Sequence, residues 1–248
     1  MTIVTDARCA RTAHLHVRHH IMRLTATALL VIASSANAAT APTIAECETA
    51  YSELEAKNYA SPLRQLELCT ANLEINALTR SRYHLGRAWA LYELGRLNEA
   101  IAEQEKAFAL PAPPYRLQFA NYATMLRTAG RFEESLIAIK MGEQIDKKEG
   151  KPPSMMIQYH KGWTLQEMGR HREAIEAFTA GISDQIDYPF VYWRRAASYT
   201  AIANREAAVA DMRKFSELFT AEWRENSSAQ RLSQYREQVR SYGLTPGW

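Results

Sequence analysis

Side chains able to carry out acid–base or metal chemistry are sparse in this sequence. Histidine is the usual general base near neutral pH and a common metal ligand, and after residue 38 the chain holds three, His84, His160 and His171. They lie in no HExxH pattern or carboxylate cluster, and the sequence contains no nucleophile elbow, phosphate-binding loop or glycine-rich dinucleotide turn. We therefore interpret the histidines as structural and predict no catalytic site, no metal and no cofactor.

Two cysteines after residue 38, Cys47 and Cys69, could form a disulfide bond. Residues 44–57 predict a helix, and a second helix is predicted to begin at Ser61-Pro62, with serine as the N-cap and proline in the first turn. The cysteines lie equally far from the middle of the connection, so an antiparallel hairpin places them at the same height. We favour the disulfide over two buried free thiols. It would contribute about 3 kcal/mol by restricting the unfolded chain.

The elements that position these side chains follow a repeat. Four stretches share one helix–turn–helix pattern: ELGRLNEAI (93–101), TAGRFEESL (128–136), EMGRHREAI (167–175) and AIANREAAV (201–209). The residues at the turn are Gly95, Gly130, Gly169 and Ala203, separated by 35, 39 and 34 residues. This period is typical of stacked helical pairs.

Small residues recur on both helices of each pair, where they let two helices cross at about 8 Å. On the first helix they are Ala88, Ala123, Gly162 and Ala196, and on the second Ala100, Ser135, Ala174 and Ala208. The pattern resembles the tetratricopeptide family, most clearly in YHKGWTLQEMGRHREAIEAFTAGI (159–182). The resemblance implies an all-α, right-handed solenoid of about four to five helical pairs with a C-terminal capping helix. Such scaffolds usually hold other proteins.

The rest of the chain is assigned around these repeats. We expect a degenerate N-terminal hairpin over residues 39–80, four repeats over 81–219, and a capping helix with a short tail over 220–248. The capping helix is predicted at 229–242. The polar stretch DKKEGKPP (146–153) is predicted to be a surface loop.

The first helix of each repeat has one face that its own hairpin does not need. The inner stripe, as we call it, holds the residues 13, 10, 6 and 3 positions before each turn residue. The resemblance implies that this stripe lines a concave groove that binds a partner. The predicted binding residues are Arg82, Leu85, Trp89, Tyr92, Arg127, Tyr159, Trp163, Gln166, Phe190 and Trp193.

Large aromatic side chains are frequent anchors at interfaces. The alternative is that Trp89, Trp163 and Trp193 are mainly structural, because tightly curved solenoids bury part of this face. Leu85 and Trp89 stand where the chaperone-binding members of the family carry polar residues. An apolar or mixed peptide is therefore the favoured partner.

Residues 1–38 are typical of a secretory signal segment. A short apolar run, 24–33, precedes Ser-Ser-Ala-Asn-Ala, a small-residue pattern that signal peptidase cleaves, which predicts a mature chain beginning at Ala39. Met22 is a plausible true start. The run is too short for a membrane span, and the alternative is an apolar helix packed on the solenoid. We expect a periplasmic or secreted protein without a stable membrane anchor.

The predicted segment also carries the basic excess of the chain. Four of the 30 Lys and Arg and one of the 27 Asp and Glu lie in it, so the remaining chain has no net formal charge. This disfavours nucleic-acid partners, which require phosphate neutralisation. The pair Arg194-Arg195 is expected to be solvated.

These observations favour an exported adaptor, not an enzyme, that binds a protein or peptide segment within an envelope complex. The first alternative is a self-associating structural protein whose aromatic face is buried between copies. The second is an accessory regulator of a cell-wall enzyme.

Overall fold

The computed structural model of the protein describes residues 41–248. The secretory segment predicted over residues 1–38, with its alternative start at Met22, lies outside the described residues. Within the described part the chain forms twelve α-helices and no strand. No helix in this part combines the length and apolar character needed to span a membrane.

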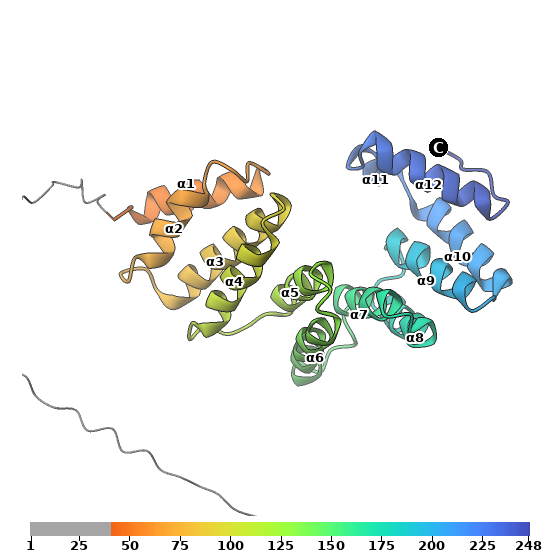
Figure 1. Ribbon diagram of the computed structural model, residues 1–248, viewed down its shortest axis with the longest axis horizontal. Coiled ribbons are helices and arrows are strands. Elements are labelled where there is room, and N and C mark those ends of the chain that lie inside the picture. Colours follow the sequence, from red (N-terminus) through yellow and green to blue (C-terminus); the bar gives the residue numbers. More distant parts are fainter. Residues whose placement is uncertain (1–40) are drawn as a thin grey trace, which may run out of the picture. The chain divides into compact units, whose positions relative to one another are not determined.

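The helices follow one another as antiparallel pairs (Figure 1). The first pair is α1 (Ile44–Glu55) with α2 (Leu63–Ala71). Four longer pairs follow: α3 (Ala77–Glu93) with α4 (Leu97–Ala109), α5 (Arg116–Thr128) with α6 (Phe132–Lys148), α7 (Met155–Glu167) with α8 (His171–Ile182), and α9 (Pro189–Ala201) with α10 (Arg205–Leu218). The chain ends with α11 (Ala221–Glu225) and α12 (Ala229–Ser241).

Each pair also packs on the next one along the chain. Helix α2 contacts α3, α4 contacts α5, α6 contacts α7, and α8 contacts α9. The first helices of successive pairs also touch, α3 with α5, α5 with α7 and α7 with α9. We call these four the inner helices. The predicted all-α solenoid of helical pairs is confirmed.

The four repeated hairpins turn through one backbone geometry. The φ angles are positive at the turn residues, 76° at Gly95, 73° at Gly130, 73° at Gly169 and 61° at Ala203. The following amide then donates to the carbonyl five residues earlier, as from Arg96 to Leu91 at 2.8 Å. This bond satisfies a carbonyl left open at the helix end. Glycine adopts the left-handed conformation freely, whereas Ala203 does so against its Cβ.

The small residues lie where the two helices of a hairpin cross. Those on the first helices, Ala88, Ala123 and Ala196, are fully buried, as are Ala100, Ser135 and Ala174 on the second helices. At Gly162 the contact is so close that an added Cβ would lie 2.5 Å from the ring of Phe178. That separation is far below a carbon–carbon contact distance.

The N-terminal hairpin is joined by the disulfide bond that the sequence favours. Cys47 on α1 and Cys69 on α2 are both fully buried, with their Cα atoms 5.8 Å apart. Helix α1 begins with a capping box between Thr43 and Glu46. The prediction that Ser61 caps the second helix is wrong, because Pro62 itself occupies the N-cap position and no side chain caps α2.

The predicted surface loop over residues 146–153 is too long at its start. Helix α6 continues to Lys148, so Asp146 lies inside it and is 2% exposed. One Asp146 carboxylate oxygen accepts from the amide of Ser154 at 2.9 Å, and the other lies 3.1 Å from Nε of Arg116. Asp146 therefore ties the end of the second pair to the start of α7. Its polar character made it resemble a loop residue.

The C-terminal helices cover the last repeat. Tyr235 and Val239 on α12, the helix predicted at 229–242, are buried. The ring of Tyr235 lies 5.6 Å from that of Phe215 on α10 and 5.3 Å from that of Phe219. The short helix α11 was not anticipated from the sequence. With α12 in place, the apolar end of the fourth repeat is covered by protein.

Replacing both cysteines by alanine is expected to lower the free energy of unfolding by about 3 kcal/mol, because the unfolded chain regains the entropy that the cross-link removes. Urea titration of the oxidised wild type and the Cys47→Ala/Cys69→Ala variant measures the difference. Adding reductant should lower the free energy of unfolding of the wild type toward that of the variant and leave the variant's value unchanged. Equal stability of oxidised and reduced wild type would contradict the prediction.

Ala203→Gly is expected to stabilise the protein by about 1 kcal/mol, since the left-handed conformation costs a Cβ-bearing residue that amount. The same chemical change at Ala102, exposed within α4, should destabilise by about 0.5–1 kcal/mol. In parallel thermal melts, Ala203→Gly is expected to raise the melting temperature and Ala102→Gly to lower it. Destabilisation at both positions would show that Ala203 carries no strain.

Ala174→Leu is expected to destabilise the protein by about 1–3 kcal/mol, because Ala174 is fully buried at a helix crossing that has no room for three more carbons. Glu173→Leu, on the exposed side of the same helix, is the matched control and should change stability far less. Chemical denaturation of both variants makes the comparison. A similar loss in each would show that the crossing is loosely packed.

Candidate functional site

The inner helices line a hollow of about 550 Å³. Five of the ten predicted binding residues lie on its wall: Trp89, Tyr92, Arg127, Tyr159 and Trp163. They come from α3, α5 and α7, and α12 adds Arg231. Part of the inner stripe of the first three repeats is therefore brought together around one cavity. We call this cavity the hollow.

Trp163 lies on the wall of the hollow and is contacted by two arginines. The guanidinium carbon of Arg127 lies 3.7 Å from its ring centroid, and that of Arg194 lies 3.6 Å from it. Two guanidinium groups cannot occupy the same space, so they stack on opposite faces of the indole. Contacts of this kind are worth about 2 kcal/mol or more when desolvated. The stack joins α5, α7 and α9, because each contributes one of the three side chains.

The indole is also oriented by a hydrogen bond and by neighbouring rings. Its Nε1 donates to the Glu167 carboxylate at 2.9 Å, one turn further along α7. The ring of Tyr159 lies edge-on to it, with centroids 5.8 Å apart. The rings of Trp89 and Tyr92, on α3, lie 5.2 Å from each other. These contacts hold the aromatic wall of the hollow in a defined arrangement.

Arg127 is a buried cation with an unusual environment. It is 6% exposed, and its Nη1 lies 3.4 Å from Nδ1 of His160. Burial lowers the pKa of Arg127 to about 10, and the nearby positive charge of Arg194 lowers it too. The pKa of His160 is lowered to about 3, first by burial and then by the charges of Arg127 and Arg194. His160 is therefore neutral near pH 7 and leaves the two arginines as the local charge.

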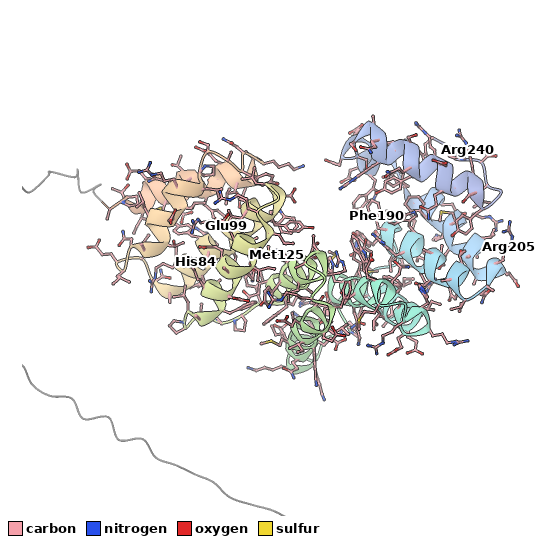
Figure 2. The ribbon with its side chains drawn as sticks, viewed as in Figure 1. His84, Glu99, Met125, Phe190, Arg205 and Arg240 are labelled. Atoms are coloured by element: carbon pink, nitrogen blue, oxygen red, sulfur yellow. A yellow bond between two sulfur atoms is a disulfide. The ribbon has the colours of Figure 1, made fainter. Side chains whose placement is uncertain are left out.

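The terminal helices contact both ends of the inner stripe. In the fourth repeat, Phe190 lies on the side of α9 that faces α11 and α12 (Figure 2), 5.3 Å from Trp223 and 5.9 Å from Tyr235. Nε1 of Trp193 donates to Gln238 on α12 at 2.6 Å. At the other end, Arg82 pairs with Glu48 on α1. These three side chains are held by helices that the repeat pattern does not include.

The remaining two predicted residues lie outside the wall of the hollow. Leu85 is half-buried on α3. Gln166 donates to the Arg194 carbonyl at 2.9 Å and to the Ser198 hydroxyl at 2.8 Å. Gln166 therefore connects α7 to α9. Its contacts are internal to the protein.

Sequence reasoning missed the role of Arg194 and of its neighbour. Both were expected to be solvated, but Arg194 stacks on Trp163, and Arg195 pairs with Asp211 at 2.7 Å. The available signal was the position of Arg194 directly after Trp193 on the inner stripe. Its partner, however, belongs to the preceding repeat. A pattern within one repeat does not reveal such a contact.

Of the three histidines in the described chain, His84 and His160 contact other side chains of the protein. His84 is buried, and its Nδ1 lies 2.5 Å from the Glu103 carboxylate. Burial raises the pKa of Glu103, but the hydrogen bond from His84, the charge of Arg87 and the hydrogen bond from Lys106 together lower it to about 2. His171 begins α8. Among the described residues no group of three or more His, Cys, Asp or Glu side chains is arranged to hold a metal ion.

Comparison with known proteins identifies tetratricopeptide repeats in two segments of this chain. The family model described as tetratricopeptide repeat matches residues 81–112 and 157–183, the first and third repeats. No curated protein matches the chain. Among solved structures, MamA AMB-1 has 17% identity and a TM-score of 0.53, over 76% of this chain and 95% of that chain.

Two further solved structures give the same result. A crystal structure of MamA has 16% identity and a TM-score of 0.56, over 71% of this chain and 96% of that chain. YrrB, described as a TPR protein with an unusual peptide-binding site, has 16% identity and a TM-score of 0.54, over 71% of this chain and 86% of that chain. At these identities the likeness concerns the fold, and the family model identifies residues 81–112 and 157–183 as tetratricopeptide repeats.

Proposed function

We propose that the protein is an adaptor that binds an extended segment of another protein in the hollow. The observation that carries the proposal is the wall itself, where Trp89, Tyr92, Tyr159 and Trp163 converge from two inner helices on a cavity of about 550 Å³. This volume lies within the range of roughly 300–1,000 Å³ that is typical of binding sites, and the wall combines these aromatic side chains with polar ones. Aromatic side chains in such a setting usually contribute most of the binding energy.

The stacking around Trp163 supports this role. An anchor residue binds best when its conformation is fixed before the partner arrives, because less entropy is then lost on binding. Two guanidinium groups and the bond to Glu167 fix the indole in this way. YrrB, which shares the fold, is described by its peptide-binding site. The proposal assigns a peptide to this chain by analogy with that description.

We further propose that the adaptor works outside the cytoplasm, within the cell envelope. Two observations support this location. The sequence of residues 1–38 is typical of a secretory signal. The disulfide bond between Cys47 and Cys69 requires an oxidising compartment to persist.

Self-association is a second candidate, and the outer side of the second repeat favours it. Ile137 and Met141 lie one turn apart on α6 and are 61% and 46% exposed. Met141 borders an apolar cavity of about 240 Å³ whose wall includes Phe108 and Tyr122. Equilibrium sedimentation of wild type and an Ile137→Glu/Met141→Glu variant tests this candidate. A dimer that the substitutions dissociate would support it.

The partner can be identified by site-specific crosslinking in the host. A photoreactive amino acid at Tyr92, on the wall of the hollow, should give a specific adduct. The same group at Glu176, on the outer helix α8, is the matched control and should not give that adduct. Identical adducts from both positions would argue against binding in the hollow.

For the partner so found, Trp163→Ala is expected to weaken binding by about 2 kcal/mol or more, as for an anchor in a desolvated pocket. Trp193→Ala should act mainly on stability, because its indole is bonded to Gln238 of the capping helix. Calorimetric titration and thermal melts of both variants separate the two effects. Unchanged binding by folded Trp163→Ala protein would refute the role of the hollow.

A further inference from the structure

Arg127 and Arg194 are positive charges for which the described chain supplies no acidic partner. Neither takes part in an ion pair among residues 41–248. The polar contacts of their guanidinium groups are with neutral atoms, Nδ1 of His160 at 3.4 Å and Oε1 of Gln166 at 3.3 Å. The buried Nε of Arg194 has no hydrogen-bond partner in this part of the chain.

Three other arginines of the described chain, all partly buried, each pair with a buried carboxylate. Arg87 pairs with buried Glu103 at 2.9 Å, Arg195 with buried Asp211 at 2.7 Å, and Arg116 with buried Asp146 at 3.1 Å. The rule they follow is that a buried charge is paired, since an unpaired one costs several kcal/mol. Arg127 departs from it at the wall of the hollow. The missing counter-charge indicates that a bound ligand supplies the negative group that pairs with Arg127.

The charges around the hollow favour an anion. Arg127, Arg194 and Arg231 contribute positive charge from three different helices. Two acidic side chains lie at the hollow, Glu167, which accepts the hydrogen bond of the Trp163 indole, and Glu93 on the wall. Because Arg127 and Arg194 lie on opposite faces of one indole, their guanidinium carbons are about 7 Å apart with the ring between them. An anionic group at the edge of the ring is therefore attracted by both charges.

We propose that the hollow recognises the carboxylate of an aspartate or glutamate side chain within the bound segment, with Arg127 and Arg194 as the residues that bind it. This inference rests on the proposed function and specifies the chemistry of the partner. A carboxylate matches the fork of guanidinium donors. The aromatic wall requires apolar or aromatic residues beside the acidic one, so the recognised segment is acidic at one position and apolar around it.

A carboxylate fits the site better than a phosphate does. Arg127 is 6% exposed behind aromatic side chains, so the group that reaches it has to be small and carried on a slender side chain. A phosphate monoester carries close to two negative charges. Bringing it beside Glu93 and Glu167 would add repulsion and a larger desolvation cost. A carboxylate brings one charge.

The test uses a displayed library of random dodecapeptides selected on the full chain. Selected peptides are synthesised with each acidic residue as it stands and replaced by its amide, and their Kd is measured by calorimetry. They are titrated into wild type, Arg127→Gln, Arg194→Gln and Trp163→Ala. Arg172→Gln, an exposed arginine on α8, is the matched control. Thermal melts show that each variant is folded, and Arg194→Gln serves if Arg127→Gln is not.

The expected result is enrichment of one aspartate or glutamate among apolar residues. Amide replacement in the peptide and Arg→Gln in the protein should each weaken binding by at least about tenfold, the loss of a charge-assisted hydrogen bond. Once either the acidic residue of the peptide or the arginine of the protein has been replaced, replacing the other should weaken binding little further. The Arg172→Gln control should bind like wild type.

The other outcomes separate the two proposals. Peptides that need Trp163 but keep their affinity after amide replacement and in both arginine variants would overturn the carboxylate assignment and leave the adaptor function standing. Selected peptides that bind the Trp163→Ala variant as tightly as the wild type would count against binding in the hollow. A selection that yields no peptide would do the same. Tighter binding of a phosphoserine version, with competition by inorganic phosphate, would replace the carboxylate by a phosphate.

Discussion

The close crossing of two helices within each hairpin is the constraint on which the rest of this structure depends. It requires residues without bulk on both helices, such as Gly162 on α7 and Ala174 on α8. It also requires a sharp turn, which the left-handed residue at each corner provides. Once these local conditions are met, each hairpin presents one face to the next pair, and the first three repeats present their first helices to the hollow. The inner stripe is a consequence of that crossing.

These conditions are local in sequence, which is why the fold could be predicted from it. The corner glycines, the small residues and the period all lie within one repeat or between adjacent ones, and the structure has them as expected. The two cysteines were placed correctly for the same reason, since a hairpin relates their heights directly. Asp146 was misplaced because a buried charged residue inside a helix looks like a loop residue until its partner, the Ser154 amide, is known.

The candidate site was harder to predict, because whether a residue belongs to it depends on which other helices pack over that residue. Trp89, Trp163 and Trp193 occupy equivalent or neighbouring positions on the inner stripe, and no property of the residues themselves separates them. In the structure α12 packs on Trp193 through Gln238, while Trp89 and Trp163 remain on the wall of the hollow. The role of Arg194 depended in turn on a contact between repeats. Contacts from outside a repeat therefore decide which parts of the stripe are core and which are surface.

Helix α12 has two functions in this arrangement, and together they link the end of the chain to the hollow. It covers the last repeat through Tyr235 and Val239, and it also brings Arg231 to the wall of the hollow. A ligand that touches Arg231 favours the state in which α12 is docked, by the amount of that interaction. By the same linkage, undocking α12 removes one wall residue and frees the indole of Trp193. Binding of a ligand in the hollow therefore opposes fraying of the C-terminal helix. Amide hydrogen exchange along α12 becomes slower as the hollow fills, and so reports its occupancy.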